Sequence, residues 1–376
     1  MSALPVIPVV GIDIGGANLK LARTDGTSHS SYFPLWSDHQ QLAARLQRLL
    51  QQFCSPMSVN DCRLALTMTG EMADCFATRG SGVQAILSHV AAAAPGAQIF
   101  VYGVDGSWLS PATASDDPWR VASSNWHALA SWLARAPGLG DAGTRLIVDI
   151  GSTTVDIIPV NMHSVATAAR TDSQRLQQQQ LVYTGLSRTP VAAILSQVTI
   201  NGRNHPLVAE KFATSDDAYI VLGLVSAAQP SMPSVAAVST EDASNGQFKY
   251  TEHPDTADGR SRSVPHARAR LARMLGEDSE RLQHGEIEAL AEQIVNAQAA
   301  QIAAAILHNL PNDSRTSPPG ILFSGHGRCL AERALGLLSR PVQASFLEEL
   351  ISPAVARCGP AAAVAWLLEQ RLGSIA

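Results

Sequence analysis

The chain has 376 residues, of which 46% are hydrophobic and 16% charged, and its formal net charge is −5. This length suits two domains of ordinary size, and the hydrophobic content excludes a globally disordered chain. The acidic balance leaves no basic surface for nucleic acid, while a local positive site for a small anion stays compatible with it.

The sequence carries no targeting or membrane signal. No run of residues approaches the roughly 18 consecutive apolar positions of a membrane-spanning helix. The first residues, MSALPVIPVVGIDIGG, lack the basic region of a signal peptide. The cysteines are odd in number and include no CxxC pair. We therefore expect a cytoplasmic protein with reduced thiols and without a membrane or nucleic-acid partner. Nothing in the sequence indicates an oligomeric state.

Two segments of the chain share one plan. Residues 9–26, VVGIDIGGANLKLARTDG, and residues 146–161, LIVDIGSTTVDIIPVN, each have a β-branched run, Asp-Ile-Gly, a small polar turn and a second apolar run. The two aspartates, Asp13 and Asp149, are separated by the length of a domain, which favours two duplicated modules over a solenoid. In each copy the first run predicts a buried strand, and the glycine turn predicts an antiparallel hairpin.

Helices and strands alternate after the first hairpin. We expect helices at 38–53, 82–94 and 122–135 and strands at 62–68 and 98–103. This alternation predicts a mainly parallel sheet with both faces covered. The segment PGLGDAG at 137–143 is the best candidate for a junction, so we expect a first domain at 1–140 and a second at 145–376.

The second half is less regular. Residues 172–180 are polar and predict an exposed helix or a loop, and residues 226–262 predict a long loop region because they are rich in Ser, Pro, Asp and Gly. The other expected elements are helices at 265–275, 285–309 and 353–370 and a strand at 320–323. We expect residues from about 170 to 285 to form an insertion in the second domain, and the final helix to pack back on the first.

Each Asp-Ile-Gly places a carboxylate at the end of a buried strand, beside a turn whose N–H groups can bind oxyanions. Asp13 and Asp149 would hold Mg²⁺ through water, and Lys20 would add a cation. The other expected phosphate-binding residues of the two turns are Gly15, Gly16, Asn18, Gly151, Ser152, Thr153 and Thr154. The alternative is that either glycine turn only closes its hairpin. Both copies at domain spacing favour a two-sided diphosphate clamp.

The two turns also carry a family resemblance. DIGGANLK and DIGSTTVD resemble the two phosphate loops of the actin/sugar-kinase/Hsp70 superfold, and GILFSGHGRC (320–329) resembles its nucleotide-side glycine turn. This resemblance implies an α/β fold of duplicated actin-like ATPase (ribonuclease H-like) domains with a central cleft. It also implies that Gly325, His326 and Gly327 bind phosphate.

A narrower resemblance covers most of the chain. Its ordered motifs include TMTGEMADCF (67–76), SSNWHALASW (123–132), RTDSQRL (170–176), LVYTGLSRTPV (181–191), KFATSDDAYIVLG (211–223) and TADGRS (256–261). The set is similar to hydantoinase/oxoprolinase-related proteins of tetrahydromethanopterin-linked one-carbon transfer. It implies a transferase of methanofuran-type cofactor biosynthesis, which condenses an aminomethylfuran-methyl diphosphate with the phenol of a tyramine or tyrosine unit and releases pyrophosphate.

Other functions stay open at this point. The superfold equally supports an ATP-dependent small-molecule kinase or a hydantoinase/oxoprolinase-like ATPase, and also a non-catalytic nucleotide-dependent switch. In the preferred interpretation Mg²⁺ is the cofactor and ATP is not required. The phenol donor is tyramine, tyrosine or a glutamylated form, and the sequence does not choose among them.

The implied reaction needs a base for the phenol proton and a wall around the furan. Asp105 and Glu71 each follow a predicted strand, where α/β sheets place ligands, and we prefer Asp105 as the base. The alternative for Asp105 is the first position of an Asp-Gly turn. Trp126 and Tyr183 would form an apolar wall, although Trp126 also suits a core position.

Some charged residues have two interpretations each. Arg188 would bind the diphosphate, or lie on the surface before a Thr-Pro turn. The pairs Asp216-Asp217 and Asp255/Asp258 would be second metal ligands, or caps and first-turn charges of helices.

Overall fold

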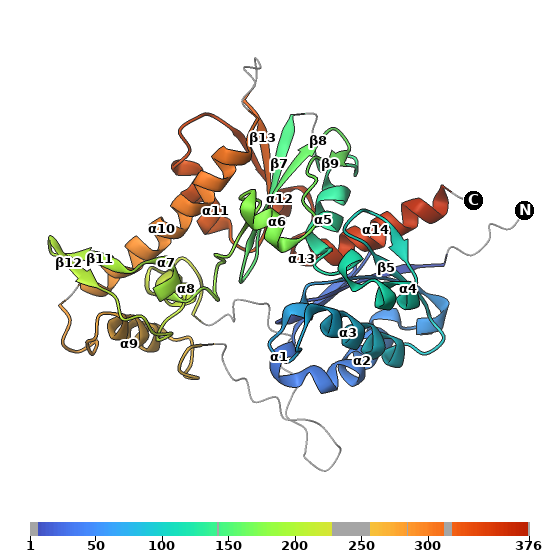
Figure 1. Cartoon of the computed structure of the whole chain (residues 1–376), viewed down its shortest axis with the longest axis horizontal. Coiled ribbons are helices and arrows are strands. Elements are labelled where there is room, and N and C mark those ends of the chain that lie inside the picture. Colours follow the sequence, from blue (N-terminus) through green and yellow to red (C-terminus); the bar gives the residue numbers. More distant parts are fainter. Residues whose placement is uncertain (1–6, 141–142, 228–255, 284, 312–317, 375–376) are drawn as a thin grey trace, which may run out of the picture.

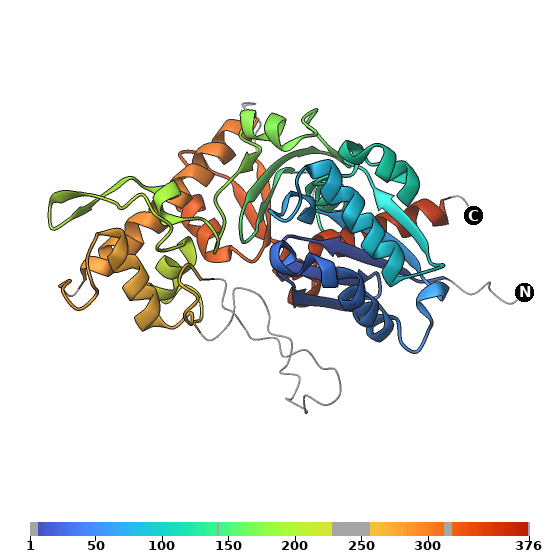
Figure 2. The same cartoon turned by 60° about the horizontal axis from the view of Figure 1, so that its bottom comes forward.

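The computed structural model describes residues 7–140, 143–227, 256–283, 285–311 and 318–374. The chain forms two halves, each built on a β-sheet with helices packed against it (Figure 1). Figure 2 shows the blue N-terminal half and the gold residues near 260–280 at opposite ends of the molecule. This arrangement confirms the predicted duplicated α/β class.

The first sheet has the strand order β3-β2-β1-β4-β5-β6. Its strands are β1 (Val9–Ile14), β2 (Asn18–Arg23), β3 (Ser28–Tyr32), β4 (Arg63–Met68), β5 (Gln98–Tyr102) and β6 (Trp108–Leu109). Strand β1 is antiparallel to β2 and parallel to β4, and β4 is parallel to β5. Every residue of β1 is buried, as expected for a strand covered on both faces.

The second sheet repeats this order as β10-β8-β7-β13-β14. Its strands are β7 (Thr144–Ile150), β8 (Val155–Asn161), β9 (Ser164–Val165), β10 (Leu181–Val182), β13 (Gly320–Gly325) and β14 (Gln343–Phe346). Strand β7 is antiparallel to β8 and parallel to β13, just as β1 is to β2 and β4. The β1–β2 and β7–β8 hairpins are therefore equivalent elements of two duplicated modules.

Helices cover both sheets. The helices of the first half are α1 (Leu35–Asp38), α2 (Leu42–Cys54), α3 (Arg79–Ala93), α4 (Pro111–Asp116) and α5 (Asn125–Leu133). Those of the second half are α6 (Asp172–Gln177), α7 (Val191–Ile194), α8 (Ser215–Val221), α9 (Val264–Met274), α10 (Glu286–Asn309), α11 (Arg328–Gly336), α12 (Leu347–Leu350), α13 (Pro353–Arg357) and α14 (Gly359–Gly373). Short 3-10 turns lie at His39–Gln41, Val59–Asp61, Gly70–Met72 and Pro118–Arg120.

Three hydrophobic clusters hold these layers together. One packs α2 and α3 on the first sheet, a second packs α10 and its neighbours on the second sheet, and a third contains α5 and α14. Helix α14 lies against β1, β2 and β4, so the end of the chain packs on the first sheet. Gly11 of β1 permits this approach, because a Cβ there would lie 1.9 Å from the carbonyl oxygen of Ala361.

Most of the expected elements are present, with shifted ends. The polar segment 172–180 begins with helix α6, whose N-terminus is held by a capping box between Thr171 and Gln174. The hairpin of β11 (Gln197–Ile200) and β12 (Arg203–Pro206) was not predicted, because all four β12 residues are polar or Pro and exposed. Of the expected loop region 226–262, residues 228–255 lie outside the described residues.

Candidate active site

A cleft of about 490 Å³ runs between the two glycine hairpins. Residues of both halves line it. From the two hairpins these are Asp13, Gly15, Gly16, Ala17, Asn18, Lys20, Asp149, Gly151, Ser152, Thr153, Thr154 and Asp156. The structure thus brings together every predicted residue of the two hairpins.

Asp13 is the penultimate residue of β1 and lies beside Lys20 of β2. The β1–β2 register pairs these residues directly, and Oδ2 of Asp13 lies 3.9 Å from Nζ of Lys20. Asp13 is only 4% exposed, and its Oδ1 has no hydrogen-bond partner among the described residues. Burial raises the pKa of Asp13, partly offset by Lys20. The carboxylate is therefore desolvated and has one oxygen available to a ligand.

Asp149 occupies the same position at the end of β7. Ser324 of β13 donates a hydrogen bond from its Oγ to Oδ1 of Asp149. Burial raises the pKa of Asp149, and the negative charge of Asp13 adds to the rise while Ser324 and Lys20 oppose it. A bound cation would relieve the cost of two desolvated carboxylates in one cleft.

These two carboxylates suit Mg²⁺ better than a metal that needs a full set of protein ligands. Mg²⁺ keeps several waters and is often bound through one or two carboxylates beside phosphates. No group of three or more His, Cys, Asp or Glu residues arranged for a metal occurs in the described parts of the chain. The unpartnered Oδ1 of Asp13 fits the water-mediated contact predicted for such a site.

The two hairpins close in the same way. Gly15 N–H donates to the carbonyl of Asn18, and Gly151 N–H donates to the carbonyl of Thr154, each at 2.9 Å. These two N–H groups are used inside the turns, so the phosphate-facing donors must come from the residues that follow. A Cβ added to Gly16 would meet nothing within 4 Å, which leaves that side of the turn open.

The third glycine turn packs against the end of β7. A Cβ on Gly325 would lie 2.2 Å from the carbonyl oxygen of Ile150, and one on Gly327 would lie 2.1 Å from the Ile150 side chain. Gly325 and His326 line the cleft, whereas Gly327 is not among the lining residues. The structure therefore gives Gly327 a packing role instead of the predicted phosphate contact.

The side chain of His326 is held neutral in the cleft. Burial lowers its pKa to about 4, with further contributions from Lys20 and Arg357. Its Nε2 is buried without a hydrogen-bond partner in the described structure. A neutral imidazole there can donate or accept one hydrogen bond to a bound oxyanion.

A second acidic group of the cleft lies beside Asp149. Asp156 is the cross-strand partner of Asp149 and forms an ion pair with Arg175 at 2.8 Å. The Arg175 guanidinium also stacks over the ring of Trp126 at 4.1 Å. Burial raises the pKa of Asp156 to about 6. Sequence analysis missed Asp156 and Arg175, although aligning the two copies places Asp156 at the position of Lys20.

The predicted substrate residues lie at different depths. Trp126 is buried but lines the cleft, and Tyr183 lines it with 49% exposure. Arg188 also lines it, and its guanidinium lies 4.5 Å over the ring of Trp36 from the other half. Glu71 is only 1% exposed and lies behind the cleft wall, where it accepts a hydrogen bond from Ser123 at 2.9 Å.

Asp105 does not reach the cleft, which corrects the prediction that it is the base. It starts an Asp-Gly turn, and its Oδ1 accepts hydrogen bonds from the N–H and Oγ of Ser107. Its side chain is 48% exposed and is paired with Arg120. These hydrogen bonds and this pair outweigh its partial burial and lower its pKa, as expected for a turn residue.

The loop of residues 184–189 is hydrogen-bonded to the turn of the second hairpin. Ser187 and Arg188 donate their backbone N–H groups to the carbonyl of Ser152. Gly185 permits this contact, because a Cβ there would lie 2.5 Å from the backbone of Ser152 and Thr153. Ser215 at the start of α8 donates from its Oγ to the carbonyl of Gly185, so α8 is tied to the hairpin through this loop.

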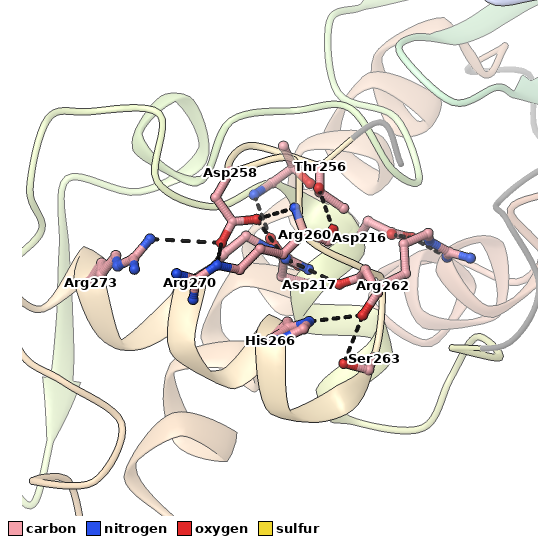
Figure 3. Close-up of polar contacts among 12 residues, drawn as sticks. Asp216, Asp217, Thr256, Asp258, Arg260, Arg262, Ser263, His266, Arg270 and Arg273 are labelled. Atoms are coloured by element: carbon pink, nitrogen blue, oxygen red, sulfur yellow. Dashed lines mark hydrogen bonds and ion pairs between the residues drawn. The ribbon is translucent and has the colours of Figure 1, made fainter. Parts of the chain in front are cut away.

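The aspartates of α8 belong to an arginine network (Figure 3). Arg262 reaches both oxygens of Asp216 at 2.6 and 2.7 Å, and the buried Arg270 contacts Asp217 and Asp258. Asp217 also caps α8 through the N–H of Thr214. Arginine side chains pair with these carboxylates, so the cap interpretation holds for Asp216 and Asp217. Asp255 lies outside the described residues.

Comparison with known proteins places the chain in a family. The family model for hydantoinase/oxoprolinase matches residues 63–334. The (4-{4-[2-(gamma-L-glutamylamino)ethyl]phenoxymethyl}furan-2-yl)methanamine synthase of Methanocaldococcus jannaschii is 30% identical over 370 residues, covering 97% of this chain and 99% of that protein. The synthase of the same name from Methanococcus vannielii is 35% identical over 77 residues, covering 20% of this chain and 34% of that protein. The chain belongs to the hydantoinase/oxoprolinase family.

A solved structure supports the fold at whole-chain scale. The nucleotide-free structure of acetone carboxylase matches with a TM-score of 0.51 and 10% identity, covering 95% of this chain and 70% of that one. Together with the repeated strand order, this likeness supports an α/β fold of two related halves. Among the described residues, no helix combines the length and apolar character needed to cross a membrane.

Proposed function

We propose that the chain is a transferase that joins an aminomethylfuran-methyl diphosphate to a phenol and releases pyrophosphate. The observation that carries the proposal is the pair of facing glycine hairpins, with Asp13 and Lys20 on one side and Asp149 on the other. This cleft occurs in a chain that is 30% identical over almost its whole length to a synthase. The name of that synthase describes a phenoxymethyl ether between a furan methanamine and a phenyl ring with a glutamylated aminoethyl group.

The bond changes of this reaction balance without an oxidant or a reductant. The phenol oxygen attacks the methylene carbon on the furan, and a new carbon–oxygen ether bond forms. The bond between that carbon and the diphosphate oxygen breaks, and its electron pair leaves with pyrophosphate. The phenol proton passes to solvent or to a cleft carboxylate. We favour a glutamylated tyramine as the phenol, since the name of the relative contains this group.

The part of the cleft around Lys20 would stabilise the departing diphosphate. Lys20 supplies a positive charge, the hairpin turns supply N–H and hydroxyl donors, and neutral His326 supplies one further hydrogen bond. Mg²⁺ would be held by Asp13 and Asp149 and would neutralise charge on the diphosphate. Preorganised donors of this kind contribute most when water is excluded. The proposal requires no ATP.

Aromatic residues would protect the reacting carbon. Breaking the carbon–oxygen bond leaves the furfuryl carbon electron-poor, so water would compete with the phenol. Trp36, Trp126 and Tyr183 also line the cleft. Their rings would exclude water from this carbon and orient the two aromatic substrates for attack.

The test is a reaction without ATP. Purified protein is incubated with Mg²⁺, the furan diphosphate and either tyramine or glutamyl-tyramine, and pyrophosphate and the ether are measured by coupled assay and mass spectrometry. We expect pyrophosphate release that depends on the phenol and matches the ether in amount. Absence of release without ATP, with ADP formed once ATP is added, would contradict the proposal and indicate a kinase-like enzyme.

A further inference from the structure

The two hairpins present opposite charges to one cleft. Lys20 is the cross-strand partner of Asp13, and Asp156 is the cross-strand partner of Asp149. Directly opposed residues on neighbouring strands project to the same side of the sheet. The duplicated backbone therefore carries a cation near one aspartate and a second carboxylate near the other.

Asp156 belongs to a group that we call the carboxylate end, formed by Glu71, Asp156 and Asp172 with the guanidinium groups of Arg79 and Arg175. Arg175 pairs with Asp156 at 2.8 Å, and Arg79 pairs with Asp172 at 2.5 Å. Arg79 lies farther from Glu71, at 3.8 Å. Three carboxyl groups thus share two guanidinium groups, and Asp156 and Asp172 hold the two close contacts.

Glu71 is the carboxyl group of this cluster that lacks a close cation. It is 1% exposed, its Oε1 accepts the hydrogen bond from Ser123, and its Oε2 has no partner among the described residues. Ser123 lines the cleft and also contacts Asp172, so the Glu71 carboxylate is directed at the cleft wall. Burial raises the pKa of Glu71. A desolvated carboxylate without a full partner is costly unless a cation is supplied.

We propose that the carboxylate end binds the primary ammonium group of the furan substrate; this inference rests on the proposed function. Asp156 and Asp172 line the cleft and contact the ammonium group, and the nearby cation favours the ionised form of Glu71 behind Ser123. An ammonium group has three donors and matches several carboxylate oxygens at once.

The short distance between Asp156 and the diphosphate site suits one small substrate. Opposed residues of an antiparallel pair have Cα atoms about 5 Å apart, so Asp156 lies one strand from the aspartate of the diphosphate site. A furan ring with one methylene on each side bridges such a distance. Trp126, over whose ring Arg175 stacks, lies at the same end of the cleft as Asp156.

The charges of the cleft also fix the orientation of this substrate. Lys20 lies with Asp13 and Asp149, and Arg357 also lines the cleft and acts with Lys20 on His326. With Mg²⁺ held by Asp13 and Asp149, an ammonium group placed there would meet positive charges, and a diphosphate placed at the carboxylate end would lie beside Asp156 and Asp172. The amine is therefore a specificity element, because a furan diphosphate without it loses the contacts with Asp156 and Asp172.

The experiment compares two substrates in four proteins. The substrates are [5-(aminomethyl)furan-3-yl]methyl diphosphate and its 5-methyl analogue, and the proteins are wild type, Asp172→Asn, Glu71→Gln and the control Asp116→Asn on exposed α4. A charged hydrogen bond contributes about 1.5–3 kcal/mol, which corresponds to roughly 10- to 150-fold in kcat/KM. We expect wild type and the control to prefer the amine by this factor. The two cleft variants should lose most of the preference, measured as the ratio of kcat/KM for the amine substrate to kcat/KM for the methyl analogue.

Failure of the ammonium site and failure of the proposed function give different results. Equal turnover of both substrates by wild type, or an equal loss on both substrates in the variants, would overturn the ammonium site while leaving the transferase intact. If neither substrate releases pyrophosphate, the proposed function fails. Calorimetric binding of [5-(aminomethyl)furan-3-yl]methanol, with its methyl analogue as control, then decides the ammonium site. Binding that needs the amine and is weakened at least tenfold in Asp172→Asn supports the site, and its absence overturns it.

Discussion

The carboxylate of Asp13 lies 3.9 Å from the ammonium group of Lys20, across the first pair of strands in the chain. One carboxylate oxygen faces Lys20, and the other has no hydrogen-bond partner among the described residues. Lys20 partly offsets the cost of burying this charged acid beside the cleft, and one oxygen is left for a ligand. This arrangement makes Asp13 the most direct residue with which to test the diphosphate site.

Asp13→Asn should abolish most activity while the fold persists. The amide has nearly the same shape but lacks the charge that would hold Mg²⁺ and position Lys20. Loss of one preorganised electrostatic group of this kind costs roughly 10²- to 10³-fold in kcat. The measurement is pyrophosphate release at saturating substrate, with circular dichroism as the check on folding. Turnover equal to wild type would remove Asp13 from the site.

Lys20→Ala should lower kcat/KM for the diphosphate substrate by about 10- to 100-fold, because a charged hydrogen bond contributes about 1.5–3 kcal/mol. Lys20→Arg is the matched variant, since it keeps the charge and should retain more activity than the alanine variant. Steady-state kinetics at several ionic strengths gives both values. An unchanged kcat/KM in Lys20→Ala would show that the lysine only pairs with Asp13.

Gly11→Ala should destabilise the protein through the contact of α14 with β1. The added methyl group would lie 1.9 Å from the backbone oxygen of Ala361, so the helix must move. Overpacking of this kind typically costs about 1–3 kcal/mol. Gly336→Ala is the control, because a Cβ there meets nothing within 4 Å. Urea denaturation compares both variants, and equal midpoints would contradict the close approach.

Arg270→Met should strongly destabilise the network shown in Figure 3. Arg270 is fully buried, and its loss leaves Asp217 and Asp258 without their main partner. Breaking a buried ion pair by removing one member costs about 3–5 kcal/mol. The exposed pair of Arg281 with Glu277 provides the control, because Arg281→Met should cost under about 1 kcal/mol. Similar losses in both variants would refute a structural role for the network.

Acid should destabilise the protein partly through His127. Burial lowers the pKa of His127 to about 4, and Arg170 and Arg135 add to the shift. Between pH 6.5 and 4 the unfolded chain therefore binds a proton that the folded chain does not, so stability falls as the pH falls. The full effect is roughly 3 kcal/mol, since one pKa unit corresponds to about 1.4 kcal/mol.

His127→Gln isolates this effect. Glutamine keeps a polar group near the hydroxyl of Tyr102, which lies 3.0 Å from Nδ1 of His127, but it does not titrate. Other buried groups titrate in both proteins, so the difference between the two stability curves reports on His127. The free energy of unfolding is measured at pH 7, 6, 5 and 4. Parallel curves for the two proteins would contradict a buried neutral histidine.

The hairpins could be predicted because their signals are local. A β-branched run, Asp-Ile-Gly and a polar turn specify a strand, a carboxylate and a turn that can bind phosphate, all within about ten residues. The duplication then placed Asp13 and Asp149 on facing sides of one cleft. The same local pattern failed for Asp105, because β5 is separated from β1 by β4 and its end turns back through β6.

The carboxylate end could not be predicted from local pattern. Glu71, Asp156 and Asp172 come from three separate segments, and they meet only because α6 packs beside the second hairpin and contacts α3 through Arg79. Asp172 occupies the first turn of α6, where an acidic residue is ordinary. Only Asp156 could have been found from the sequence, because it holds in the second hairpin the position that Lys20 holds in the first.

The measurement that tests the central claim most directly follows the oxygen that joins the furan methylene to the diphosphate. This bridging position is labelled with ¹⁸O, and the products formed with Mg²⁺ and the phenol, without ATP, are analysed by mass spectrometry. Attack on carbon predicts that all of the label appears in pyrophosphate and none in the ether. Label retained on a furan alcohol, with the diphosphoryl group transferred to the phenol, would contradict the transferase and show attack on phosphorus.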